Sequence, residues 1–73
     1  MALILTHHAR ERMALRGITA EMVEEAIHTP GWTDHGYSDK FLAFKQFPPG
    51  LLKVVYTVSG NDYVVVSTIW EEV

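Results

Sequence analysis

The sequence predicts an α+β domain with two N-terminal helices on one face of a four-stranded antiparallel meander sheet. Three observations lead to this fold class. The first thirty residues carry helical periodicity and helix caps, and the residues after Pro30-Gly31 form strand-like runs separated by turn residues. A chain of 73 residues is also long enough for one core only, so we expect residues 1–73 to form a single domain.

Two helices are predicted before the sheet. Thr6 is a suitable N-cap for the helix-forming run from 7 to 16, and Gly17 supplies its stop. Thr19 caps a second helix from about 20 to 28. The apolar residues of this second helix fall on one side of it and should face the core; they are Met22, Val23, Ala26 and Ile27.

Four strands are predicted after the helices, over residues 32 to 36, 41 to 47, 51 to 58 and 63 to 70. The second strand is rich in aromatic residues, and the third alternates in a way that indicates one buried face. The fourth is almost continuously apolar, which predicts a central or doubly covered strand. Residues 2 to 5 fit either a short edge strand or an apolar arm.

Composition limits where the protein is expected to be located and which partners it is expected to bind. Hydrophobic residues make up 48% of the chain and charged residues 21%, which is typical of folded domains. The chain has no cysteine, and its short apolar start lacks the basic region of a signal peptide, so we expect a cytoplasmic protein that does not cross a membrane. The net charge is -3, so a role in RNA binding requires a local basic patch.

The densest polar cluster lies in the first predicted helix, which holds three of the six basic residues and two of the four histidines. At about 100° per residue, His8, Arg12 and Arg16 follow one margin of the buried stripe, where they can line a groove. Arginine binds phosphate through two parallel hydrogen bonds, and an imidazole that titrates near neutral pH can move the proton of a ribose 2′-hydroxyl. The cluster therefore fits RNA cleavage.

A structural interpretation of the same residues stays open. In it, Arg12 and Arg16 pair with acidic side chains such as Glu11, Glu25 or Asp39, and the histidine caps an edge of the core. The aromatic residues are expected to pack in the core and on the sheet. We expect neither a metal nor a cofactor, because no zinc-ligand spacing is present.

The same helix also carries a family resemblance. His8-Ala9-Arg10-Glu11-Arg12-Met13, followed by Arg16-Gly17-Ile18, resembles the opening signature of the domain-of-unknown-function 4258 family. The resemblance continues through Val23-Glu24-Glu25-Ala26-Ile27, Leu52-Lys53-Val54-Val55-Tyr56 and Val64-Val65-Val66-Ser67-Thr68, so it covers nearly the whole chain. That family is similar in its order of elements to BrnT and, more distantly, to RelE-like toxins.

The resemblance implies a hydrolase, a metal-independent endoribonuclease of a toxin–antitoxin pair. The catalytic residues that it implies are His8 as the proton-transfer group, Arg12 and Tyr56. The substrate-binding residues that it implies are Arg16, Lys45 and Lys53. The expected partners are then RNA and a cognate antitoxin.

A second hypothesis keeps the fold without the chemistry. The chain is then a non-catalytic protein-binding or regulatory module. It binds another small protein, or a second copy of itself, through a sheet edge or through the surface around Trp32 and Trp70. The His/Arg helix favours the endoribonuclease, whereas the net charge of -3 favours the binding module.

Overall fold

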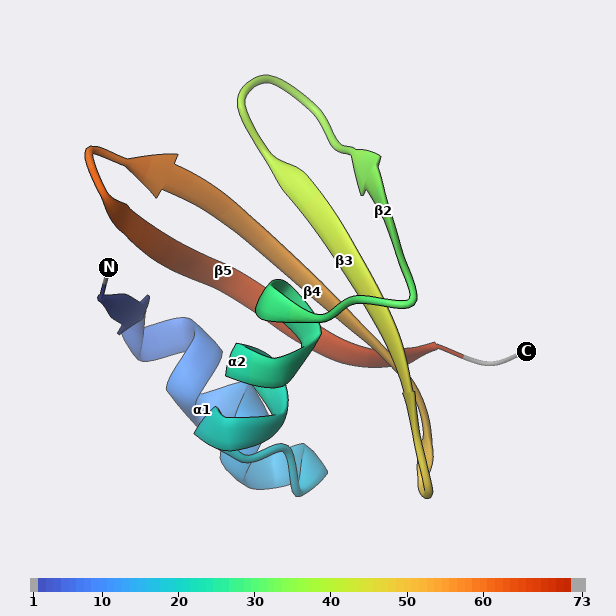
Figure 1. Cartoon of the computed structure of the whole chain (residues 1–73). Helices are drawn as coiled ribbons and strands as arrows, with labels where there is room; N and C mark the ends of the chain where they lie inside the picture. The colour runs from blue at the N-terminus through green and yellow to red at the C-terminus, as the bar shows by residue number, and fades with distance from the viewer. Residues whose placement is uncertain (1, 72–73) are drawn as a thin grey trace.

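A computed structural model of the chain describes residues 2–71 and has two helices on one face of a five-stranded sheet (Figure 1). Residues 1, 72 and 73, which the expected single domain includes, lie outside the described residues. The elements are β1 (Leu3–Leu5), α1 (His7–Arg16), α2 (Ala20–His28), β2 (Trp32–His35), β3 (Phe41–Phe47), β4 (Gly50–Ser59) and β5 (Asp62–Glu71). Both helices and the last four strands agree with the sequence-based ranges to within one residue at each end.

The sheet is mixed, which corrects the expected four-stranded antiparallel meander. Its order is β1-β5-β4-β3-β2, and β1 runs parallel to β5 while the other pairs are antiparallel. The Tyr63 amide donates to the Ala2 carbonyl at 2.9 Å, and the Thr6 amide donates to the Val65 carbonyl at 3.3 Å. Leu3 and Leu5 pack against the core. Of the two interpretations of residues 2 to 5, the edge strand is therefore the right one.

The predicted helix caps are confirmed. Thr6 Oγ1 accepts from the Ala9 amide at 3.1 Å, and Thr19 Oγ1 accepts from the Met22 amide at 3.2 Å. Gly17 ends α1 with a left-handed φ of 68°, a conformation that glycine adopts without steric cost. None of the described helices is long and apolar enough to span a membrane.

The core lies between the helices and the sheet face beneath them, here called the covered face. In Figure 1, α1 lies over β5, and α2 lies over β3 and β4. By strand register the covered face carries Phe41, Ala43, Lys45, Phe47, Leu52, Val54, Tyr56, Tyr63, Val65, Thr68 and Trp70. Ala43, Leu52, Val54 and Val65 are fully buried there. This face forms because Ala9 and Met13 of α1, and the apolar side of α2, close over it.

The opposite face of the sheet, here called the open face, has no helix over it (Figure 1). By register it carries Ile4, Trp32, Asp34, Leu42, Phe44, Gln46, Leu51, Lys53, Val55, Thr57, Val64, Ser67, Ile69 and Glu71. The predicted central position of β5 is confirmed, since β5 lies between β1 and β4. Helices cover only one of its two faces, so the doubly covered alternative is wrong.

Candidate functional site

His8 and Arg12 lie one turn apart on the exposed side of α1. Residues four apart on a helix have neighbouring side chains, about 5–6 Å between Cβ atoms. Within residues 2–71, neither side chain takes part in a hydrogen bond or an ion pair of the fold. Both groups are therefore available to a ligand in solution.

Arg16, the third residue of the predicted margin, points to the sheet instead. Its Nη1 donates to the Thr68 carbonyl of β5 at 2.6 Å, and its own carbonyl accepts from Trp70 Nε1 at 2.9 Å. Both contacts are partly buried. The end of α1 is thus attached to β5 through Arg16. Of the three residues expected to line a groove, only His8 and Arg12 remain fully on the exposed side of the helix.

Lys45 and Lys53 point to opposite faces of the sheet. Lys45 is on the covered face, where its Nζ donates to the Thr29 carbonyl at 2.7 Å and lies 3.4 Å from Glu25 Oε2. A cation there stabilises the C-terminus of α2. Lys53 is on the open face, with its Nζ 3.3 Å from Glu71 Oε1. The two lysines do not contribute to one common site.

The acidic side chains named as partners of the arginines contact other groups. Glu11 Oε1 lies 2.7 Å from His7 Nε2, and Glu25 pairs with Lys45. Asp39 Oδ2 accepts from Thr57 Oγ1 at 3.4 Å. Among residues 2–71, the arginine ion pairs of the structural interpretation do not form, and Arg12 is exposed.

Tyr56 belongs to a row of rings that crosses four strands on the covered face and reaches the end of α2. The aromatic row consists of His35, Phe41, Tyr56, Tyr63 and His28, in that order. Neighbouring ring centroids lie 5.6 or 5.7 Å apart. The sequence analysis assigned Phe41 and Tyr63 to packing and named Tyr56 as a catalytic residue. It did not predict the row, because the row depends on strand register, which brings Phe41 opposite Tyr56.

The environment of Tyr56 keeps its hydroxyl protonated. Burial penalises the phenolate, and the nearby Tyr63 adds charge repulsion, so the pKa of Tyr56 is raised from its ordinary value of 10.0. A neutral phenol can donate a hydrogen bond and offer a ring face, but it is a poor base near pH 7. No hydrogen bond, ion pair or ring contact of the described chain joins Tyr56 to His8 or Arg12.

The described residues hold no cluster of three or more histidine or acidic side chains suited to a metal ion. Groups able to transfer a proton or to bind an anion come together in two places of the described chain. One is the exposed pair of α1, where an imidazole lies next to a guanidinium. The other is the aromatic row, where two histidines flank two tyrosines across the sheet.

Comparison with known proteins identifies the family of the chain. The family model described as Domain of unknown function (DUF4258) matches residues 5–71. No curated protein and no solved structure matches the chain. The match spans both helices and the strands β2 to β5, including His8, Arg12 and the aromatic row. The chain therefore belongs to the DUF4258 family, as its first helix predicted.

Proposed function

We propose that this chain is a toxin-like, metal-independent endoribonuclease domain, in which His8 transfers protons and Arg12 holds the scissile phosphate. The proposed likeness to BrnT and to RelE-like toxins is part of this proposal. The observation that supports it is the exposure of His8 and Arg12 one turn apart, with no partner within residues 2–71. A guanidinium without an intramolecular partner is free to bind an anionic ligand.

The distribution of charge between the two helices also supports RNA as the ligand of α1. α1 contains three arginines and one glutamate, whereas α2 contains Glu21, Glu24 and Glu25 and no arginine or lysine. The basic residues of a chain of net charge -3 are thus concentrated on α1 and absent from α2 apart from His28, which favours α1 as the place for an RNA ligand.

The proposed reaction is an internal transfer at phosphorus. His8 takes the proton of the ribose 2′-hydroxyl, and the 2′-oxygen attacks the phosphate that Arg12 holds. A bond forms between the 2′-oxygen and phosphorus while the bond to the 5′-oxygen breaks, and the 5′-oxygen takes a proton from water. The products are a 2′,3′-cyclic phosphate and a 5′-hydroxyl.

The structure changes the roles proposed for the other residues. Arg16 and Lys45 are positioning residues of the fold, since each is bonded to backbone carbonyls. Lys53 lies on the open face and is left out of the proposed RNA site. Tyr56 is proposed to bind RNA as a hydrogen-bond donor and a stacking surface in the aromatic row, because every nucleobase offers a π-face.

The test is cleavage of a labelled single-stranded RNA with EDTA present, by wild type, His8→Ala and His7→Ala proteins purified in the same way. General acid–base groups contribute typically about 10²–10⁴-fold, so His8→Ala should lose at least about 100-fold in rate. His7 is exposed and pairs with Glu11, so His7→Ala should keep the wild-type rate. The proposal fails if wild type leaves the RNA intact, or if the two variants behave alike.

Arg12 is tested with two substitutions. Arg12→Gln removes the charge and should lower the rate strongly, whereas Arg12→Lys keeps the charge, loses the two-point contact and should recover part of it. Full activity of Arg12→Gln would remove this residue from the proposed site. The cyclic phosphate end of the product distinguishes this reaction from metal-dependent hydrolysis.

A non-catalytic binding module is the second candidate function, and the open face favours it. Eight large apolar residues of that face have no helix over them. If wild type leaves RNA intact and His8→Ala does not change any property of the protein, this second function replaces the first.

A further inference from the structure

The helices bury only one end of the covered face. Along β4 the residues of this face change from fully buried Val54 through half-buried Tyr56 to Val58, which is 45% exposed. On β5, Val65 is fully buried and Tyr63, two residues earlier, is half-buried. In Figure 1 the turn between β4 and β5 lies beyond both helices. The covered face therefore has an end that meets solvent, and the aromatic row crosses the sheet at this end.

The rings of the row offer polar groups as well as ring faces. His28 and His35 are exposed, and the three rings between them are half-buried. Within residues 2–71, neither the hydroxyls of the two tyrosines nor the imidazoles of the two histidines take part in a hydrogen bond or an ion pair. None of these groups is among the buried polar atoms without a partner. The polar groups of four rings are therefore open to a ligand.

A ligand that suits the row has flat faces and hydrogen-bonding edges. Nucleobases have both, and they stack on aromatic side chains whatever their identity. A partner that covered the row with apolar groups would leave the four polar rings without hydrogen bonds, which costs free energy. In a duplex the faces of the bases are stacked on one another, so only unpaired bases can stack on the protein. The chemistry of the row thus favours an unpaired strand.

The row ends close to the first turn of α1. Tyr63 is paired with β1, and the carbonyl of Val65, two residues further along β5, accepts from the Thr6 amide at 3.3 Å. Thr6 caps α1, and His8 is the second residue of that helix. A strand that follows the row past Tyr63 therefore comes to the part of α1 that carries His8, with the guanidinium of Arg12 one turn further on to bind its phosphate.

We propose that the aromatic row binds a single-stranded segment of RNA, whose bases stack on Phe41, Tyr56 and Tyr63 and whose backbone continues to His8 and Arg12. The inference rests on the proposed function, which supplies RNA as the ligand. It adds that the substrate is unpaired, and that the row accepts bases of any identity because stacking does not read their edges.

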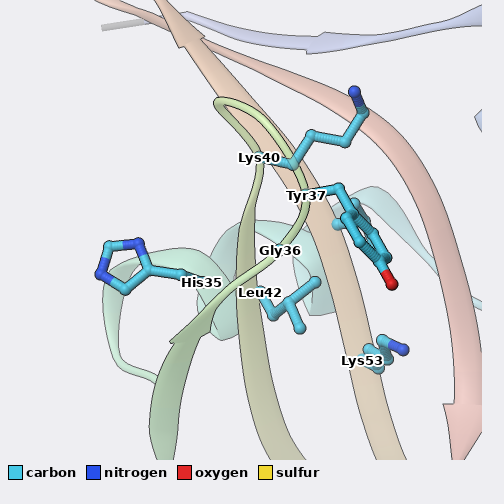
Figure 2. Close-up of a pocket in the computed structure, with 7 residues that line it drawn as sticks. His35, Gly36, Tyr37, Lys40, Leu42 and Lys53 are labelled. Carbon is cyan, nitrogen blue, oxygen red and sulfur yellow. The ribbon is translucent and has the colours of Figure 1, made fainter.

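Tyr37 provides a matched control, because it is an exposed tyrosine outside the row. It is 93% exposed and lines a cavity of about 450 Å³ on the open face. In Figure 2 the side chains of Tyr37 and Lys53 lie on the same side of the strands, and His35, at one end of the row, points away from them. Loss of the Tyr37 ring therefore leaves the row intact.

The test is the binding of a fluorescently labelled RNA of mixed sequence, as a single strand and annealed to its complement, measured by anisotropy. The protein carries His8→Ala, so that cleavage does not consume the RNA. The single strand should bind at least about 10-fold more tightly than the duplex. Phe41→Leu and Tyr63→Leu keep an apolar side chain without the ring, and each should weaken binding of the single strand at least about 5-fold. Tyr37→Leu should bind as its parent does.

The thermal midpoint verifies that each variant is folded, and His28→Ala changes an exposed ring of the row without a change in the core. Equal binding of single strand and duplex overturns the inference, and so do row variants that bind the single strand as tightly as Tyr37→Leu does. If wild type binds the single strand through the row and does not cleave it, the proposed function fails and this inference stands. If wild type cleaves RNA and the row variants cleave at the same rate, this inference fails and the proposed function stands.

Discussion

The covered and open faces of the sheet both carry apolar side chains, but in different environments. Ala43, Leu52 and Val54 point to the helices and are fully buried, whereas Leu42 and Val55, one position away, are only half-buried. Alternation along a strand therefore does not identify the core by itself when both sets are apolar. Helix packing decides which set is the core, and the other set lies on the face that no helix covers.

The largest expected difference between the two faces is in the free energy of unfolding. Leu52→Ala creates a cavity in the core and should cost about 2–5 kcal/mol. Leu42→Ala, on the open face, should cost under about 1 kcal/mol, because Leu42 is only half-buried. Urea denaturation at low protein concentration measures both. Equal losses would mean that the open face is also part of the monomer core.

A second comparison is between two arginines of α1, because Arg16 joins this helix to β5 and Arg12 does not contact the sheet through a hydrogen bond of the described residues. Arg16→Met removes the hydrogen bond to the Thr68 carbonyl and should cost about 1.5–3 kcal/mol, as is typical of bonds from charged donors. Arg12→Met changes an exposed side chain without a partner and should stay within about 0.5 kcal/mol of wild type. Chemical denaturation of the pair compares them. The reverse order would contradict the division of roles along α1.

Thr68 places a hydroxyl group in the apolar covered face. It is fully buried, and its Oγ1 has no hydrogen-bond partner among the described residues. Thr68→Val has the same shape without the hydroxyl, so it should raise stability by about 1 kcal/mol. Thr57→Val is the control, because Thr57 Oγ1 donates to Asp39 and its loss should not stabilise. A lower thermal midpoint for Thr68→Val would show that this hydroxyl has a partner in solution.

The smallest effect concerns Tyr56, at the edge of the covered face, and appears only at high pH. Its pKa is raised above 10.0 by burial and by Tyr63, so the folded chain holds this proton more tightly than the unfolded chain does. The stabilisation is fully present below pH 10 and is lost as the pH rises through the folded-state pKa. The thermal midpoints of wild type and Tyr56→Phe should run parallel from about pH 7 to 9 and converge or cross above pH 10.

Parallel midpoints up to pH 11 would mean that Tyr56 ionises freely in the folded protein. A spectrophotometric titration of the phenols identifies which tyrosine is responsible, since Tyr56→Phe removes the group whose pKa is raised. This measurement also tests how far the half-buried environment of Tyr56 disfavours its phenolate.

Part of the candidate site was predictable from the sequence. The helical period placed His8 and Arg12 on an exposed margin, and the same run of residues identified the family. The role of Arg16 was not predictable, because its partner Thr68 is 52 residues away. The separation of Lys45 from Lys53 and the order of the aromatic row depend on strand register, to which local sequence contributes little.

The sequence alone determined the two helices and the bounds of the last four strands. These depend on neighbours within a few residues: threonine caps, a glycine stop, and turn residues between apolar runs. Only the tertiary structure decided that residues 3 to 5 pair with β5, which face of the sheet is the core, and which arginine of α1 stays free. Those outcomes depend on contacts between segments some fifty or sixty residues apart, which form only when the whole chain has packed.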